Sequence, residues 1–121
     1  MPNHASQPVR SWELRIGSET LAGVAVLRVA GRISGRTAPL LAQAIGAGPA
    51  ADHPLILDLT AVDYISSAGF AVLHAAASSR VVVVCGLSDP LATTFGLAEH
   101  PPQLIREPAL PNALERVTRH P

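Results

Sequence analysis

Two adjacent hydroxyl groups, on Ser66 and Ser67, stand where a predicted strand is followed by a predicted helix. The apolar run at residues 55–57 indicates a buried strand, and the pattern from Ser67 onward indicates the helix. A hydroxyl at a helix N-terminus can cap the helix by accepting a backbone N–H. A phosphate on that hydroxyl would meet backbone N–H groups and the positive end of the helix dipole. The spacing therefore predicts either a structural cap or a phosphorylation site.

The predicted helix after these serines has two different faces, because successive residues turn by about 100°. The apolar face, which we expect to pack on a sheet, holds Gly69, Val72, Leu73 and Ala76. The small and polar face holds Ser67, Ala71, His74 and Ser78. The second face is either solvated surface or a docking surface for a partner.

The other predicted elements alternate strands with helices along the chain. Strands are expected at residues 12–16, 23–30, 55–59, 81–86 and 104–105, and helices at 38–45, 67–77, 89–97 and 112–119. Residues 17–20 are expected to form a hairpin connection, and Thr37 is expected to cap the first helix. This order predicts an α/β fold with a mixed, mostly parallel sheet of about five strands and about four helices. Residues 1–11 are expected to be a flexible tail, and residues 12–121 a single domain.

Composition narrows the class of function. The chain has 121 residues, 48% of them hydrophobic, and nine basic residues balance nine acidic ones, so no broad surface should attract nucleic acid or an anionic membrane. Its one cysteine, Cys85, cannot form an internal disulfide and is compatible with a reducing compartment. The first ten residues lack the apolar core of a secretory signal, so we expect a cytoplasmic protein.

Enzymatic and metal chemistry are both disfavoured by the residues present. Ser67 lacks the Gly-x-Ser-x-Gly pattern of a hydrolase, and His74 would lie about 10 Å further along the same helix, too far to act as its base. The histidines are scattered rather than paired at ligand spacing, at His4, His53, His74, His100 and His120. The chain has no lysine for a phosphate-binding loop. We therefore expect no catalytic residues, no metal and no cofactor.

The segment from Asp58 to Leu73 resembles the phospho-acceptor region of STAS domains, the family of bacterial anti-sigma-factor antagonists. Asp58 corresponds to the strand-end aspartate of that family, and Thr60 to the Ser/Thr that follows it. Ser67 falls on the serine that a cognate kinase phosphorylates, and Gly69 on the glycine of the helix start. The predicted element order is also that of the STAS fold.

The resemblance implies a non-enzymatic transcription regulator that binds an anti-sigma factor with serine kinase activity. It implies that phosphorylation of Ser67, with Ser66 as the second choice, switches the protein off. The expected partner-binding residues are Ser34, Ser66, Ser67, Ala71 and His74. Many antagonists carry acidic residues at the positions of Ser34 and Ser66, and the serines here favour an alternative. The alternative is a constitutive structural subunit of a signalling assembly or of a lipid-transport ATPase complex, in which Ser67 is only a cap.

Overall fold

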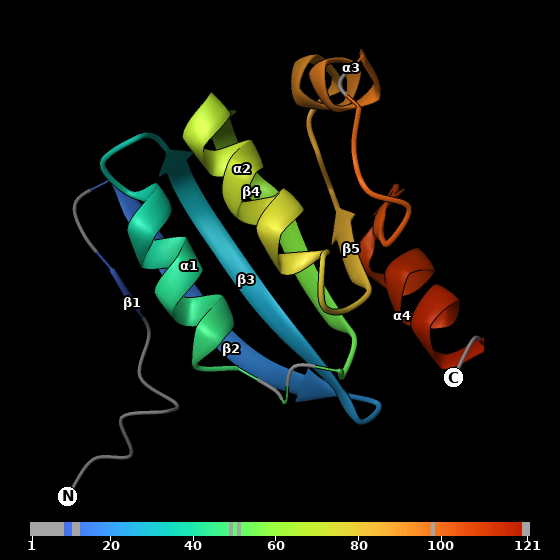
Figure 1. Ribbon diagram of the computed structural model, residues 1–121. Helices are drawn as coiled ribbons and strands as arrows, with labels where there is room; N and C mark the ends of the chain where they lie inside the picture. The colour runs from blue at the N-terminus through green and yellow to red at the C-terminus, as the bar shows by residue number, and fades with distance from the viewer. Residues whose placement is uncertain (1–8, 11–12, 49, 51, 98, 120–121) are drawn as a thin grey trace, which may run out of the picture.

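The computed structural model describes residues 9–10, 13–48, 50, 52–97 and 99–119, which form one sheet of six strands with four helices (Figure 1). The strands are β1 (Val9–Arg10), β2 (Leu14–Leu21), β3 (Val24–Ile33), β4 (Leu55–Ile65), β5 (Val82–Cys85) and β6 (Leu104–Glu107). The helices are α1 (Ala38–Gly46), α2 (Ser67–Ala76), α3 (Asp89–Leu97) and α4 (Leu110–Arg119). None of the helices in the described ranges is long and apolar enough to cross a membrane.

The strands lie in the sheet in the order in which they occur along the chain. β1, β2 and β3 pair antiparallel, whereas β3, β4, β5 and β6 pair parallel. The predicted α/β fold with a mixed, mostly parallel sheet is therefore confirmed. The additional strand is β1, which falls within the residues expected to be a tail and pairs with β2. The expected tail residues 1–8 and 11 lie outside the described residues, as does residue 12 of the first predicted strand.

Helices cover both faces of the parallel part of the sheet. α1 and α2 lie side by side over one face, where they pack on alternate strand residues such as Leu55 and Leu57 (Figure 1). α4 packs on the other face, against Ile56 and Val83. β4 and β5 are consequently buried on both sides, which explains why their sequences read as continuous apolar runs.

The hairpin between β2 and β3 turns at a different place from the one predicted. β2 continues through residues 17–20, and the turn is formed by Ala22 and Gly23, with Leu21 paired to Val24. Both turn residues have positive φ, 50° and 78°, as a two-residue type I′ turn requires. The predicted connection at residues 17–20 is therefore wrong, because polar residues there belong to a solvent-facing strand rather than to a turn.

β4 is longer than the predicted strand at residues 55–59. After Asp58 its pairing with β3 passes through register shifts and then continues to Ile65, which lies opposite Ile33. Asp58 is therefore inside the strand rather than at its end. Because β3 and β4 are parallel and end together, the segments that follow them leave the same edge of the sheet. The Ser66 N–H donates to the Ile33 carbonyl oxygen at 2.7 Å and holds the two segments together.

Candidate functional site

The hydroxyl groups of Ser66 and Ser67 have different surroundings. Ser66 is the N-cap of α2: its backbone is extended, its Oγ accepts the Gly69 N–H at 3.2 Å, and its carbonyl accepts the Phe70 N–H at 3.0 Å. Ser67 is the first helical residue and is exposed, and its hydroxyl makes no hydrogen bond with any residue that the structure describes. The capping role considered for Ser67 is therefore filled by Ser66, which leaves the Ser67 hydroxyl open to solvent.

We expect Ser66→Ala to destabilise the domain by about 1 kcal/mol, because it removes the side-chain cap of α2. Ser67→Ala should change the free energy of unfolding by no more than about 0.5 kcal/mol, as exposed substitutions usually do. Urea denaturation of the two variants measures the difference. Equal losses of stability in both variants would contradict the assignment of the cap to Ser66.

The turn at Ser34 is closed by reciprocal hydrogen bonds. Ser34 Oγ accepts the N–H groups of Arg36 and Thr37, at 3.2 and 3.3 Å, while Thr37 Oγ1 accepts the Ser34 N–H at 2.8 Å. Thr37 Oγ1 also donates to the Arg32 carbonyl oxygen at 2.7 Å. The predicted cap of α1 by the Thr37 side chain is therefore wrong: Thr37 is at the N-cap position with a helical backbone, and its hydroxyl braces the preceding turn.

Glu13, for which the sequence predicted no role, reaches into the same turn. The Ser34 hydroxyl donates to Glu13 Oε2 at 3.4 Å, and Arg36 Nη1 lies 3.7 Å from Glu13 Oε1. The Glu13 side chain is only 10% exposed, and its carbonyl oxygen accepts the Arg32 N–H at 2.9 Å. Its contact with Ser34 spans 21 positions and leaves no local signal in the sequence. The reciprocal hydrogen bonds between Ser34 and Thr37 did have a local signal, because Ser-x-x-Thr before a helix resembles a capping box.

The Ser34 turn and the start of α2 lie together at the carboxyl ends of β3 and β4. Gly69 allows this close approach, since a Cβ atom there would lie 2.7 Å from Ile33 Cγ2 and 2.9 Å from Ile65 Cγ2. These short distances agree with the prediction that Gly69 lies on the face of α2 that packs on the sheet.

The exposed side of α2 continues from this point along the helix. Ala71 is exposed one turn beyond Ser67, and His74 is half-buried one turn further. The expected partner-binding residues, Ser34, Ser66, Ser67, Ala71 and His74, thus fall at one end of the sheet and along one helix.

Asp58 and Thr60 belong to a separate cluster on the other face of the sheet. Asp58 Oδ1 accepts the N–H and the hydroxyl of Thr60, at 3.1 and 2.6 Å, and Asp58 Oδ2 lies 3.1 Å from Arg28 Nη1. The pKa of the Arg28 guanidinium is raised, chiefly because Arg28 donates a hydrogen bond to the Glu19 carboxylate. Burial, followed by the charge of Asp58, raises the pKa of the neighbouring Cys85 thiol to about 12. This cluster braces the middle of β4 and does not adjoin Ser67.

The described residues contain no group of three or more His, Cys, Asp or Glu side chains arranged to hold a metal ion. His4 and His120 lie outside the described part of the chain. The Ser34–Ser67 site presents the exposed hydroxyl of Ser67 at a helix N-terminus, the small apolar side chains of α2, and the ion pair of Glu13 with Arg36 at the Ser34 turn.

Comparison with known proteins identifies relatives of this chain. Residues 15–104 match the family model of the STAS domain. A crystal structure of an anti-sigma factor antagonist from Mycobacterium paratuberculosis is 33% identical and superposes with a TM-score of 0.67, over 88% of this chain and 95% of that chain. No match was found among curated proteins.

More distant structures share the fold alone. A STAS domain protein from Planctomyces limnophilus is 16% identical, with a TM-score of 0.68 over 85% of this chain and 97% of that chain. The anti-sigma factor antagonist SpoIIAA in its unphosphorylated form is 13% identical, with a TM-score of 0.59 over 88% of this chain and 99% of that chain.

Proposed function

This chain belongs to the STAS domain family, and we propose that it is an anti-sigma-factor antagonist controlled by phosphorylation of Ser67. In this proposal it acts in the cytoplasm, binds an anti-sigma factor with serine kinase activity and so releases a sigma factor. Phosphorylation of Ser67 ends the binding. The 33% identity with the Mycobacterium paratuberculosis antagonist supports the choice of partner class.

The observation that carries the proposal is that the two serines have different roles: Ser66 caps α2, and Ser67 is exposed. Ser66 satisfies the first turn of α2, so modification of Ser67 removes no hydrogen bond from the helix. The first turn of α2 contains no acidic residue, and the positive end of the helix can offset part of the charge of a phosphate. The phosphorylated protein is therefore expected to stay folded while its binding surface changes.

The surface around Ser67 suits a switch of this kind. α1 and α2 contain no Asp, Glu, Lys or Arg, and the exposed side of α2 carries small residues such as Ala71 and Ala75. The cores of protein interfaces are similarly depleted of charge. A phosphate would bring a charge of about −1.5 to −2 to the end of this uncharged surface.

The proposed modification is a transfer of the γ-phosphoryl group of ATP held by the kinase. The Ser67 oxygen forms the new bond to phosphorus, ADP leaves, and a base of the kinase takes the hydroxyl proton. The antagonist supplies only a positioned, exposed hydroxyl, and it needs no cofactor or catalytic residue of its own.

The direct test is the intact mass of the protein purified from its native host, with the modified residue located by fragmentation. We expect one added phosphate on Ser67, absent from a Ser67→Ala variant and still present in a Ser66→Ala variant. Phosphate confined to Ser66, or a chain that stays unmodified under every growth condition, would contradict the phosphorylation switch.

We expect Ala71→Glu to weaken binding of the anti-sigma factor at least tenfold without unfolding the domain, because it places a charge on the exposed side of α2. Thr93→Glu, an exposed substitution on α3, is the matched control and should bind like the wild type. Isothermal titration measures the affinities, and circular dichroism checks the fold. Unchanged affinity of Ala71→Glu would show that α2 is not the docking helix.

A second candidate function is a constitutive structural subunit of a signalling assembly or of a lipid-transport ATPase complex. Two observations favour it. The hydroxyls of Ser34 and Ser66 accept hydrogen bonds from the local backbone, so both serines have structural roles. Neither position carries the acidic side chain that many antagonists have there. In that case the protein would carry no phosphate in its host and would co-purify with an ATPase in constant ratio.

A further inference from the structure

β4 contains two extra residues relative to its parallel neighbour β3. Between Asp58 and Ala61, β4 advances by three residues while β3 advances by two. Between Val62 and Tyr64, β4 advances by two residues while β3 advances by one. Each of these intervals is a β-bulge, in which the longer strand accommodates one additional residue. The register of everything that follows in the chain therefore depends on both bulges.

The bulges explain the spacing of the apolar residues in the second half of β4. Leu59, Val62 and Ile65 are three positions apart, so in a regular strand successive members would point to opposite faces of the sheet. All three are nevertheless buried in the same core cluster, on the face that α1 and α2 cover. A bulge in each interval compensates for the odd spacing. A slip of one residue would therefore turn these apolar side chains away from the core.

The first bulge is held by the Asp58 side chain. Its Oδ1 accepts the backbone N–H and the hydroxyl of Thr60, at 3.1 and 2.6 Å, and its Oδ2 is paired with Arg28. Asp58 is only 8% exposed, and Gly86 leaves room for the Thr60 hydroxyl, because a Cβ atom at Gly86 would overlap it. At the second bulge the extra residue, Asp63, is exposed, and its side chain makes no hydrogen bond or ion pair with any residue that the structure describes. The first bulge is thus the one that a side-chain acceptor fixes.

We propose that Asp58 is a positioning residue for Ser67. By accepting two hydrogen bonds from Thr60, its carboxylate fixes the first bulge and with it the register of the rest of β4. In this register the Ser66 N–H meets the Ile33 carbonyl oxygen at 2.7 Å, and α2 begins at Ser67. Asp58 does not contact Ser67 and acts through the strand between them. The relevance of this placement to phosphorylation rests on the proposed function, whereas the placement itself does not.

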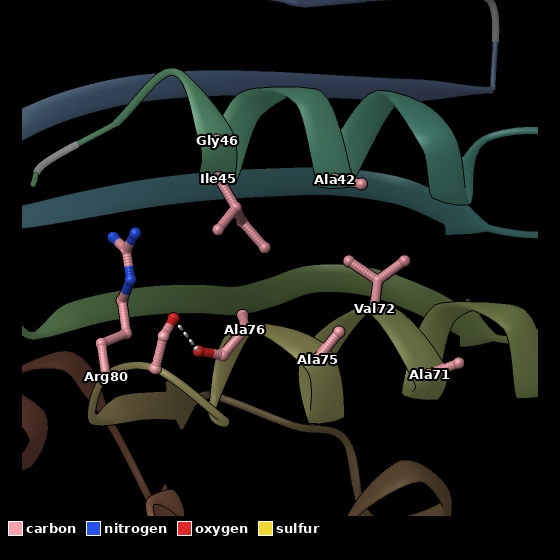
Figure 2. Close-up of a pocket in the computed structure, with 9 residues that line it drawn as sticks. Ala42, Ile45, Gly46, Ala71, Val72, Ala75, Ala76 and Arg80 are labelled. Carbon is pink, nitrogen blue, oxygen red and sulfur yellow. Dashed lines mark hydrogen bonds between the residues drawn. The ribbon is translucent and has the colours of Figure 1, made fainter. Parts of the chain in front are cut away.

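The same register sets how α2 faces its neighbours. α2 begins directly after β4, and Val72 of α2 and Ile45 of α1 point into the space between the two helices (Figure 2). A shift of one residue at the start of a helix turns its side chains by about 100°. Such a shift would turn Val72 away from α1 and would remove Ala71 from the proposed docking face. Asp58 therefore influences both the Ser67 hydroxyl and the surface beside it.

The experiment follows the hydrogen bond between Ser66 and Ile33 by NMR in the ¹⁵N,¹³C-labelled full chain. One readout is the scalar coupling across this hydrogen bond. The other is the hydrogen-exchange rate of the Ser66 amide divided by that of the amide of Val83, a buried residue of β5. The ratio corrects for a loss of global stability, which speeds exchange throughout the core. We expect Asp58→Ala to abolish the coupling and to raise the ratio at least tenfold, because two hydrogen bonds to a carboxylate are lost.

Matched variants separate the hydrogen bonds from the charge. Asp58→Asn keeps an oxygen that can accept both hydrogen bonds, so it should retain the coupling and a ratio within about threefold of the wild type. Arg28→Gln removes the ion pair with Asp58 and should leave both readouts unchanged. If Asp58→Ala fails to fold, Thr60→Val replaces it, with Thr60→Ser as its control. Thr60→Val removes one of the two hydrogen bonds and should raise the ratio at least about threefold.

The proposal has clear contrary outcomes. Wild-type readouts in Asp58→Ala or, where that variant does not fold, in Thr60→Val would overturn it. Equal losses in Asp58→Asn and Asp58→Ala would also overturn it, because the charge rather than the acceptor would then be responsible. Neither readout depends on a kinase or a partner. A wild-type protein that carries no phosphate in its host would contradict the proposed switch alone, whereas the two NMR readouts decide the role of Asp58.

Discussion

We expect Ser67→Asp to lower the affinity of this protein for the proposed partner, an anti-sigma factor, about 100- to 1,000-fold. The new carboxylate would stand at the exposed start of α2, at the end of a surface that carries no charge on either α1 or α2. Mismatched charge in an interface costs several kcal/mol, and each 1.4 kcal/mol corresponds to a tenfold change in affinity. The effect on folding should be small, because an acid in the first turn of a helix is favourable.

Asn112→Asp is the matched control for this substitution. Asn112 is also exposed in the first turn of a helix, α4, which covers the opposite face of the sheet. Both variants should unfold at the urea concentration of the wild type, and only Ser67→Asp should lose binding in isothermal titration. Wild-type affinity of Ser67→Asp would refute the switch, even if the protein still binds the partner through α2.

Gly31→Ala will destabilise the domain by about 2–5 kcal/mol, a large part of the stability of a typical domain. Gly31 has φ of +110°, which L side chains rarely adopt, and its Cβ would lie 2.0 Å from the Glu13 carbonyl oxygen. The clash is with backbone atoms, so no side-chain rotation can relieve it. The displaced strand would be the one that places Glu13 against the Ser34 turn.

Gly17→Ala provides the comparison for this prediction. Gly17 is also in the β2–β3 hairpin, but a Cβ there has no heavy atom within 4 Å and its φ is not in the strained region. This variant should keep wild-type stability or gain up to about 1 kcal/mol through the reduced entropy of its unfolded chain. Urea denaturation of both proteins measures the contrast, and similar midpoints would contradict the close approach of Gly31 to Glu13.

The fold was predictable because its main signal is burial. The apolar runs of β4 and β5 mark strands covered on both faces, and the two-faced pattern of α2 separates Leu73, in the core, from Ala71, at the surface. These patterns depend on residues near one another in the chain. The segment that resembles the STAS phospho-acceptor region was recognisable for the same reason, since the strand, the serines and Gly69 are contiguous.

The errors concern features that burial does not determine. Ala22 adopts positive φ in the hairpin turn although it is not glycine, so its residue type did not indicate that the turn lies there. Thr37 sits directly before a helix, yet its hydroxyl is used by the Arg32 carbonyl and the Ser34 N–H. The role of Glu13 depends on a contact between two distant segments, which a single sequence does not reveal.

The strands lie in the sheet in the same order as along the chain, and this has a consequence for biosynthesis. Each strand pairs with the one synthesised just before it, so every step of sheet assembly closes only a short loop, and the domain can assemble from its N-terminus as it leaves the ribosome. β6 and α4 are the last elements to be made. Until they arrive, the nascent sheet ends at β5, whose four residues, Val82–Cys85, are all buried in the finished domain. This unpaired apolar edge is the surface at which incomplete chains would associate with one another.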